Sequence, residues 1–231
     1  MKSLIYFFFG IFSFMLFAQT DYDLAENYFN KGEFEKALFL YQKLQKSSPT
    51  NSNLVYRIIE IQQELQRFDE VETFIKTQMD IRNNPQMLIE LGYNFQRQNK
   101  LKKAKENYQK AINLAKSVPN YTYAIGLRFE AHSLVSQAIE VYKLALNQTQ
   151  NSNYEYRLAG LYAEQKDVKN MFLCYLNFSE NNPTYLNQVL RLFGEYILED
   201  SSSEYNVMLK KIILKKLQSS SNLFWNQMLS W

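Results

Sequence analysis

Leu91-Gly92-Tyr93-Asn94-Phe95 is followed by Leu101, Ala104, Tyr108 and Ala111. The spacing of these apolar residues predicts two short amphipathic helices joined by a turn. Each helix has a small residue near its middle, where a bulky one would hold a neighbouring backbone away. The stretch therefore predicts a tightly packed helical hairpin.

The same pattern returns along the chain at a nearly constant interval. A fixed period in this range indicates an array of helical repeats. Proline can begin a helix but cannot continue one, and Pro49, Pro85, Pro119 and Pro183 all fall where this period places a joint between units. The steps are 34, 33, 34 and 33 residues for Ala37, Val71, Ala104, Ala138 and Met171, and again for Tyr41, Ile75, Tyr108, Tyr142 and Tyr175.

The first unit adds a more specific signal. It contains Leu24-Ala25-x-x-Tyr28, then Gly32-x-Phe34, then Ala37-x-x-x-Tyr41 and a closing Pro49. These residues resemble the tetratricopeptide repeat. The resemblance implies an all-α fold, a right-handed α-solenoid of helix-turn-helix repeats, and it implies that Leu24, Ala25 and Tyr28 pack between helices.

The period divides the chain into predicted segments. Residues 1–18 form a signal peptide, and residues 19–183 form five repeats, at about 18–51, 52–84, 85–118, 119–151 and 152–183. Residues 184–219 form a degenerate helix pair, with helices expected over 186–198 and 205–217, and residues 220–231 begin a further helix. Because an array normally ends in a polar capping helix, and this chain stops on Trp231, we expect more repeats or another domain to follow.

The N-terminus has the layout of a secretory signal. A Lys precedes an apolar run from Leu4 to Ala18, and polar residues follow. A helix of that run would span about 22 Å, less than the roughly 30 Å of a membrane core, which favours cleavage after Ala18 over an uncleaved anchor. No second membrane span is expected. Cleavage would leave a net charge of +2, because the segment holds one Lys and no acid.

Composition and motifs argue against several classes of function. The small net charge is not the footprint of a nucleic-acid-binding protein. The lone Cys174 can form no internal disulfide and is expected to be a small buried hydrophobic residue, and the lone His132 cannot build a metal site. Phosphate-binding loops, paired Cys motifs and a nucleophile elbow are absent from the sequence. We therefore expect neither an enzyme nor a bound cofactor.

The first helix of each unit carries a second stripe of residues beside the one that packs between helices. In the repeats that this chain resembles, this second stripe lines the concave surface where peptides bind, so it implies a binding groove. The register also places Ile89 and Gln96 on this stripe. Repeats that clamp a C-terminal carboxylate have cations and amides here, whereas this chain has acids in its first two units. The candidate protein-binding residues are Tyr22, Glu26, Phe29, Tyr56, Glu60, Tyr93, Arg97, Tyr123 and Tyr156.

The first hypothesis for function is a non-enzymatic interaction scaffold or adaptor of the bacterial envelope or periplasm, which binds a protein or peptide in this groove. The alternative is the N-terminal sensory or docking array of a longer signalling protein or envelope enzyme. RNA binding by a helical repeat is a third reading, which export and low charge oppose. The sequence leaves the identity of the partner and the oligomeric state open.

Overall fold

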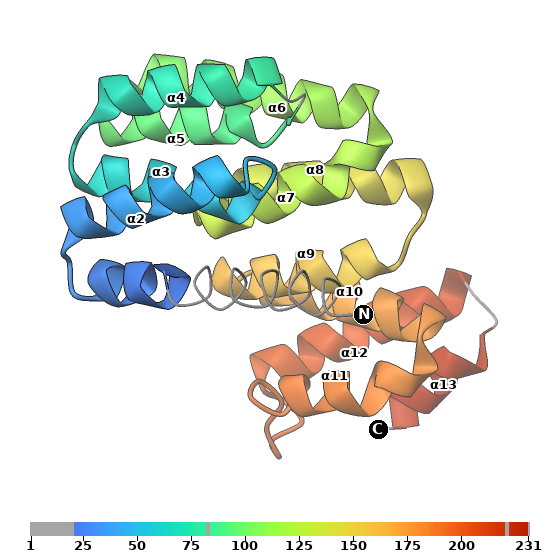
Figure 1. The fold of residues 1–231 in the computed structure, drawn as a ribbon. Helices are drawn as coiled ribbons and strands as arrows, with labels where there is room; N and C mark the ends of the chain where they lie inside the picture. The colour runs from blue at the N-terminus through green and yellow to red at the C-terminus, as the bar shows by residue number, and fades with distance from the viewer. Residues whose placement is uncertain (1–20, 82–83, 220–221, 231) are drawn as a thin grey trace, which may run out of the picture. The chain divides into compact units, whose positions relative to one another are not determined.

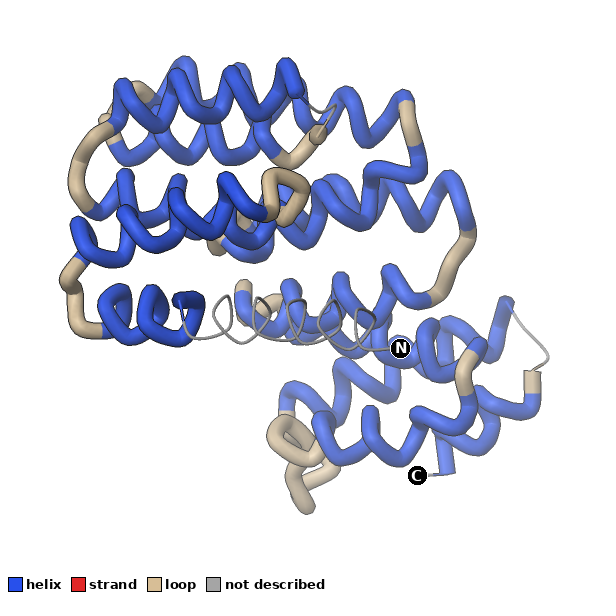
Figure 2. The backbone as a smooth tube through the Cα atoms, in the orientation of Figure 1, coloured by secondary structure: helices blue, strands red, loops and turns tan. Residues whose placement is uncertain are grey.

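The computed structural model describes residues 21–81, 84–219 and 222–230. Within these residues the secondary structure is helical, without strands, and most helices are joined by short loops, with a longer one over residues 194–203 (Figure 2). The predicted all-α fold of helix-turn-helix repeats is confirmed. The predicted signal peptide, residues 1–18, lies outside the described residues.

The chain divides into two compact units, and the boundary falls between Tyr108 and Gln109, inside helix α6. In unit 1, consecutive helices lie side by side, with α2 against α3, α3 against α4 and α4 against α5 (Figure 1). Unit 1 contains the helical residues 21–30, α2 (Phe34–Ser47), α3 (Ser52–Glu64), α4 (Phe68–Ile81), α5 (Met87–Arg97) and the first part of α6 (Leu101–Ser117).

Unit 2 also packs consecutive helices, α7 on α8, α8 on α9 and α9 on α10, and α10 then contacts both α11 and α12. Pro119 and Pro183 each begin a short 3-10 helix ahead of a longer helix. The unit contains the rest of α6, η1 (Pro119–Tyr121), α7 (Thr122–Ala131), α8 (Val135–Thr149), α9 (Asn153–Glu164), α10 (Val168–Asn181), η2 (Pro183–Tyr185), α11 (Leu186–Phe193), α12 (Glu204–Ser219) and α13 (Leu223–Ser230).

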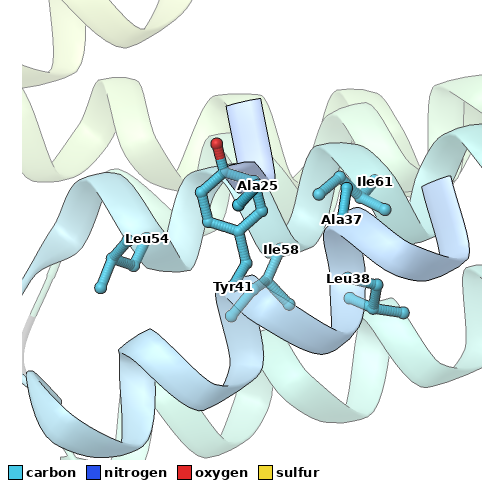
Figure 3. Packing of buried hydrophobic residues seen from close by; sticks show 7 residues of the cluster. All are labelled: Ala25, Ala37, Leu38, Tyr41, Leu54, Ile58 and Ile61. Carbon is cyan, nitrogen blue, oxygen red and sulfur yellow. The ribbon is translucent and has the colours of Figure 1, made fainter. Parts of the chain in front are cut away.

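The residues that repeat in the sequence form the core. In unit 1, Ala25, Ala37 and Tyr41 are completely buried, and Figure 3 shows the Tyr41 ring beside Ala25 and Ile58. The equivalent Ala104, Tyr108, Ala138 and Tyr142 are buried as well. The small residues therefore let helices approach, and the tyrosine rings fill the space around them.

Two glycines show how close this approach is. A methyl group added to Gly92 would lie 2.6 Å from Cδ1 of Tyr108, and one added to Gly126 would lie 2.5 Å from Cζ of Tyr142. These distances are shorter than the contact distance of two non-bonded carbon atoms, so either the methyl group or the tyrosine ring would have to move. In these two helix pairs the tyrosine ring of the second helix thus lies directly on the backbone of the first.

The turn inside each of the first five helix pairs has one recurring conformation. Its residue with positive φ is Gly32, Gln66, Asn99, Ser133 or Lys166, again at steps of 34, 33, 34 and 33. Around each, two backbone N–H groups bond back to the end of the first helix; Ser133 N donates to Glu130 O at 2.8 Å and Leu134 N to Phe129 O at 2.9 Å. The residue in the left-handed conformation thus ends the helix in a way that gives hydrogen-bond donors to carbonyls that would otherwise have none.

Two expectations about packing are wrong. Leu24 is expected between helices but is 43% exposed. The helix predicted over 186–198 ends at Phe193, followed by a turn in which Tyr196 N and Ile197 N donate to Phe193 O. The ring of Tyr196 packs instead on Phe172, with centroids 5.9 Å apart.

The final described helix packs against the preceding helices. Trp225 is completely buried, and its indole Nε1 donates a hydrogen bond of 2.8 Å to Glu180 Oε1. Phe224 and Met228 are buried with it, and the Lys216 ammonium lies 5.4 Å from the Trp225 ring centroid. The apolar residues of this helix therefore complete a local core.

The contact between Gly126 and Tyr142 can be tested with a matched pair of glycines. Gly126→Ala should overpack the hairpin and lower the free energy of unfolding by about 1–3 kcal/mol. Gly160→Ala should be neutral or stabilising by up to about 1 kcal/mol, since nothing lies within 4 Å of the added methyl. Urea unfolding of both variants measures the difference. Equal changes in stability would contradict the close contact.

Candidate functional site

In unit 1, the candidate residue Glu26 is the centre of a charged network. Its carboxylate accepts hydrogen bonds from the Tyr41 hydroxyl at 2.7 Å and from Arg57 at 2.8 Å. Burial by itself would raise the pKa of Glu26, but the bonds from Tyr41 and Arg57 outweigh it and hold the pKa below its usual value. Burial and the bond to Glu26 raise the pKa of Tyr41. The bonds from Tyr41 and Arg57, both to Oε1, therefore favour the charged form of Glu26.

Arg57 connects three of the predicted residues. Besides binding Glu26, its guanidinium binds Glu60 Oε2 at 2.8 Å and lies 4.3 Å from the centroid of the Phe29 ring. The structure thus brings Glu26, Phe29 and Glu60 together. Sequence reasoning missed Arg57, although it follows the predicted Tyr56 directly and is the cation that offsets the two acids.

The other candidates of unit 1 are engaged to different degrees. Tyr22 is 39% exposed, and its ring makes an edge contact with Tyr41. Tyr56 is half-buried and donates its hydroxyl to Gln86 Oε1 at 2.7 Å. Arg97 forms an ion pair with Glu64 at 2.5 Å. These contacts give the residues a structural role within the unit.

Of the residues that the register of the third repeat places on the binding surface, Ile89 differs from expectation. Tyr93 is half-buried, and Gln96 accepts a hydrogen bond of 3.0 Å from the Tyr108 hydroxyl. Ile89 is completely buried, so its predicted place on the binding surface is wrong. An aliphatic side chain has no polar tip to keep in water, and Ile89 packs inward where tyrosine would reach the surface.

Unit 2 repeats the arrangement seen around Glu26. The Tyr142 hydroxyl donates to Glu130, whose other carboxylate oxygen lies 3.5 Å from Arg157. Arg157 in turn donates to the Tyr123 hydroxyl at 3.2 Å, and its guanidinium lies 5.8 Å from the Tyr123 ring centroid. A buried tyrosine, a carboxylate and an arginine from the next helix pair therefore hold the candidate Tyr123 in place.

Tyr123 and Tyr156 line one cavity of about 590 Å³, which we call the tyrosine pocket. It opens among α7, α9, the end of α10, η2 and α11, so it lies wholly within unit 2. Aromatic rings and amide side chains dominate its wall. The lining residues are Tyr123, Asn151, Asn153, Tyr154, Tyr156, Arg157, Phe178, Asn182, Tyr185 and Gln188.

The aromatic wall of the pocket is held by ring contacts. Tyr156 packs against Phe178 and Tyr175 with centroids 5.1 and 5.4 Å apart, and its hydroxyl accepts a hydrogen bond of 3.3 Å from Gln188 Nε2. Tyr185 packs on Phe178 at 5.4 Å and is 47% exposed, as is Tyr123. The pocket therefore offers exposed aromatic area on a well-packed base.

The described residues offer no sign of metal or thiol chemistry. No group of three or more His, Cys, Asp or Glu residues within them could hold a metal ion. Cys174 is buried, as predicted, and burial raises the pKa of its thiol, which keeps it protonated and inert.

The geometry can now be compared with known proteins. Residues 19–51 and 85–117 match the model of the tetratricopeptide repeat family. These two segments are tetratricopeptide repeats. No curated protein matches the chain in sequence. The matched segments contain the hydrogen bond of Tyr41 to Glu26 and the contact of Gly92 with Tyr108.

Several solved structures resemble the fold. A tetratricopeptide repeat protein of Thermus thermophilus is 18% identical, with a TM-score of 0.41, over 78% of this chain and 100% of that one. PilF of Pseudomonas aeruginosa is 12% identical, with a TM-score of 0.37, over 92% and 96%. MamA of Desulfovibrio magneticus is 14% identical, with a TM-score of 0.37, over 78% and 97%.

Tetratricopeptide repeat proteins are generally interaction scaffolds that bind protein partners, and the repeats point to a non-enzymatic role. Among the helices of the described part of the chain, none combines the length and the apolar character that a membrane span requires.

The Glu26 network predicts a pH-dependent stability. Since its folded-state pKa lies below the usual 4.5, Glu26 contributes stability that is present above that pH and lost as the pH falls through the folded-state value. The stability difference between the wild type and Glu26→Gln should therefore be largest at neutral pH and shrink on acidification. Thermal unfolding at several pH values measures it.

Glu106→Gln is the control for this series, because Glu106 is exposed and has no ion pair among the described residues. Its stability difference from the wild type should stay small throughout. A Glu26→Gln difference that stays constant from neutral pH to well below 4.5 would show that the network does not hold the carboxylate.

Proposed function

We propose that the chain is a non-enzymatic protein-interaction scaffold that binds an extended peptide segment of its partner in the tyrosine pocket. The observation that carries the proposal is the pocket itself, in which four tyrosines and four amide side chains converge from consecutive helix pairs. Its volume of about 590 Å³ falls within the range of about 300–1,000 Å³ that is usual for ligand sites.

The wall chemistry favours a peptide. Tyr123 and Tyr185 offer rigid apolar area with a hydrogen-bonding tip, which costs little side-chain entropy on binding. Asn182 already donates its amide N–H groups to Ser152 Oγ and Phe178 O, both at 2.9 Å, which leaves its amide oxygen to accept from a peptide N–H. The amide N–H groups of Asn151 and Asn153 can donate to peptide carbonyls. An extended backbone presents both groups at regular intervals, so it would match these amides.

The charges favour a peptide with aromatic or proline side chains over an acidic one. Arg157 is the one cation among the lining residues, and its guanidinium is already offset by Glu130 at 3.5 Å. A buried carboxylate would need cations that are free to meet it. Aromatic-lined grooves instead suit proline-rich or aromatic segments, whose binding depends on ring contacts.

The test is affinity selection of a random peptide library on the whole protein, followed by binding of the best peptide to variants. Tyr123→Ala and Tyr185→Ala should each weaken binding at least about tenfold, because central aromatic residues dominate peptide interfaces. Tyr205→Ala is the matched control, since Tyr205 is 36% exposed and does not line the pocket. Circular dichroism should show the same helical content in all three.

Two outcomes would overturn the proposal. Selected peptides that bind the Tyr123 and Tyr185 variants as tightly as the wild type would place the interaction elsewhere. Selected peptides that do not compete with one another would not share a site. If the protein keeps its full helical content in that experiment, the result would show that the pocket is not a peptide site.

We further propose that the scaffold acts in the bacterial envelope. The support is the positive start and the apolar run from Leu4 to Ala18. N-terminal sequencing of the protein recovered from the envelope should find Gln19 as the first residue. Recovery from the cytoplasm with Met1 intact would contradict the location without affecting the peptide site.

A further inference from the structure

A second cavity of about 590 Å³ lies in unit 2 beside α12, and three lysines line it: Lys169 from the start of α10, and Lys211 and Lys215 from α12. We call it the lysine cleft. It shares no lining residue with the tyrosine pocket. Contacts between α10 and α12 hold its two sides together.

The sequence of α12 explains why the lysines converge. Lys211 and Lys215 are four residues apart and so lie on the same helix face, together with Val207. The neighbouring face carries the buried Leu209 and Ile213, which fix the rotation of the helix. Packing of one face therefore turns the lysines toward the start of α10.

The lining of the cleft has an excess of positive charge, three lysines against one glutamate. Lys169, Lys211 and Lys215 form no ion pair with any of the described residues, and Glu204 is the one acid among the lining residues. Like charges at a spacing of four residues repel each other. A ligand with negative charge would relieve this repulsion.

The base of the cleft is apolar. Val207 and Ile212 line it, and Val207 is 36% exposed. A ligand that fits this surface has carboxylates next to an apolar group. A nucleic acid fits poorly, since its binding needs a wide basic field and this chain has a net charge of only +3.

We propose that the lysine cleft binds an acidic peptide segment in which an apolar side chain lies next to carboxylates. The apolar side chain contacts Val207 and Ile212, and the carboxylates meet Lys169, Lys211 and Lys215. The chain then has two separate peptide sites in one unit, of which one selects aromatic or proline residues and the other acidic ones.

The probe is a fluorescent peptide of alternating Glu and Leu, with an alternating Gln and Leu peptide as its uncharged counterpart. The acidic peptide should bind the whole protein, and the uncharged one at least about tenfold more weakly. Lys211→Glu and Lys215→Glu should each reduce the affinity for the acidic peptide at least about tenfold. Fluorescence anisotropy measures all of these affinities.

Lys210→Glu is the matched control. It makes the same charge change on the same helix, but Lys210 lines a different groove, with Leu214 and Leu229. Its affinity should stay within about twofold of the wild type. Circular dichroism on each variant shows that the helices remain.

The proposal is overturned if Lys210→Glu weakens binding as much as Lys211→Glu, because the attraction would then be a general surface charge. Equal binding of the uncharged peptide would also overturn it, as would preferential binding to vesicles with anionic lipid. Tyr123→Ala should leave the acidic peptide bound as in the wild type, so failure of this site and failure of the tyrosine pocket can be told apart.

Discussion

The contact of a tyrosine ring with the backbone of a small residue is the constraint on which the rest of unit 2 depends. Tyr142 lies against Gly126, and only a residue without a side chain leaves room for the ring there. The ring carries a hydroxyl that donates to Glu130, and Glu130 pairs with Arg157 of the next helix pair. Arg157 then holds Tyr123 at the pocket. A short chain of contacts thus links the core packing to the wall of the tyrosine pocket.

Much of the fold could be predicted because the period of the sequence is a packing period. Ala37, Tyr41, Ala138 and Tyr142 recur because each unit must solve the same problem of close helix approach, and all four are completely buried. The five turns were less predictable. Gly32 and, more weakly, Asn99 are residue types that favour a left-handed conformation at a helix end. Gln66, Ser133 and Lys166 adopt it because two hydrogen bonds at the end of the helix stabilise it.

The candidate site was predictable only where it lies on the regular part of a helix. Tyr123 and Tyr156 follow from the helical register, and both line the pocket. Asn182 and Tyr185 follow the end of α10 and lie outside its helical register, so sequence reasoning missed them. Phe178 lies in the register of α10, where its place predicts packing and not a pocket wall. Ile89 is wrongly assigned to the binding surface. It has the same position in its repeat as the tyrosines of the other repeats, but its aliphatic side chain is completely buried.

The most direct test of this account is a double-mutant cycle between Gly126→Ala and Tyr142→Leu, measured by urea unfolding. A leucine ends before the ring atoms that the new methyl group would strike. The account predicts that Gly126→Ala costs less in the Tyr142→Leu background than in the wild type, with a coupling of about 0.5–3 kcal/mol. Strictly additive changes in the free energy of unfolding would contradict it, because the ring and the glycine would then not constrain each other.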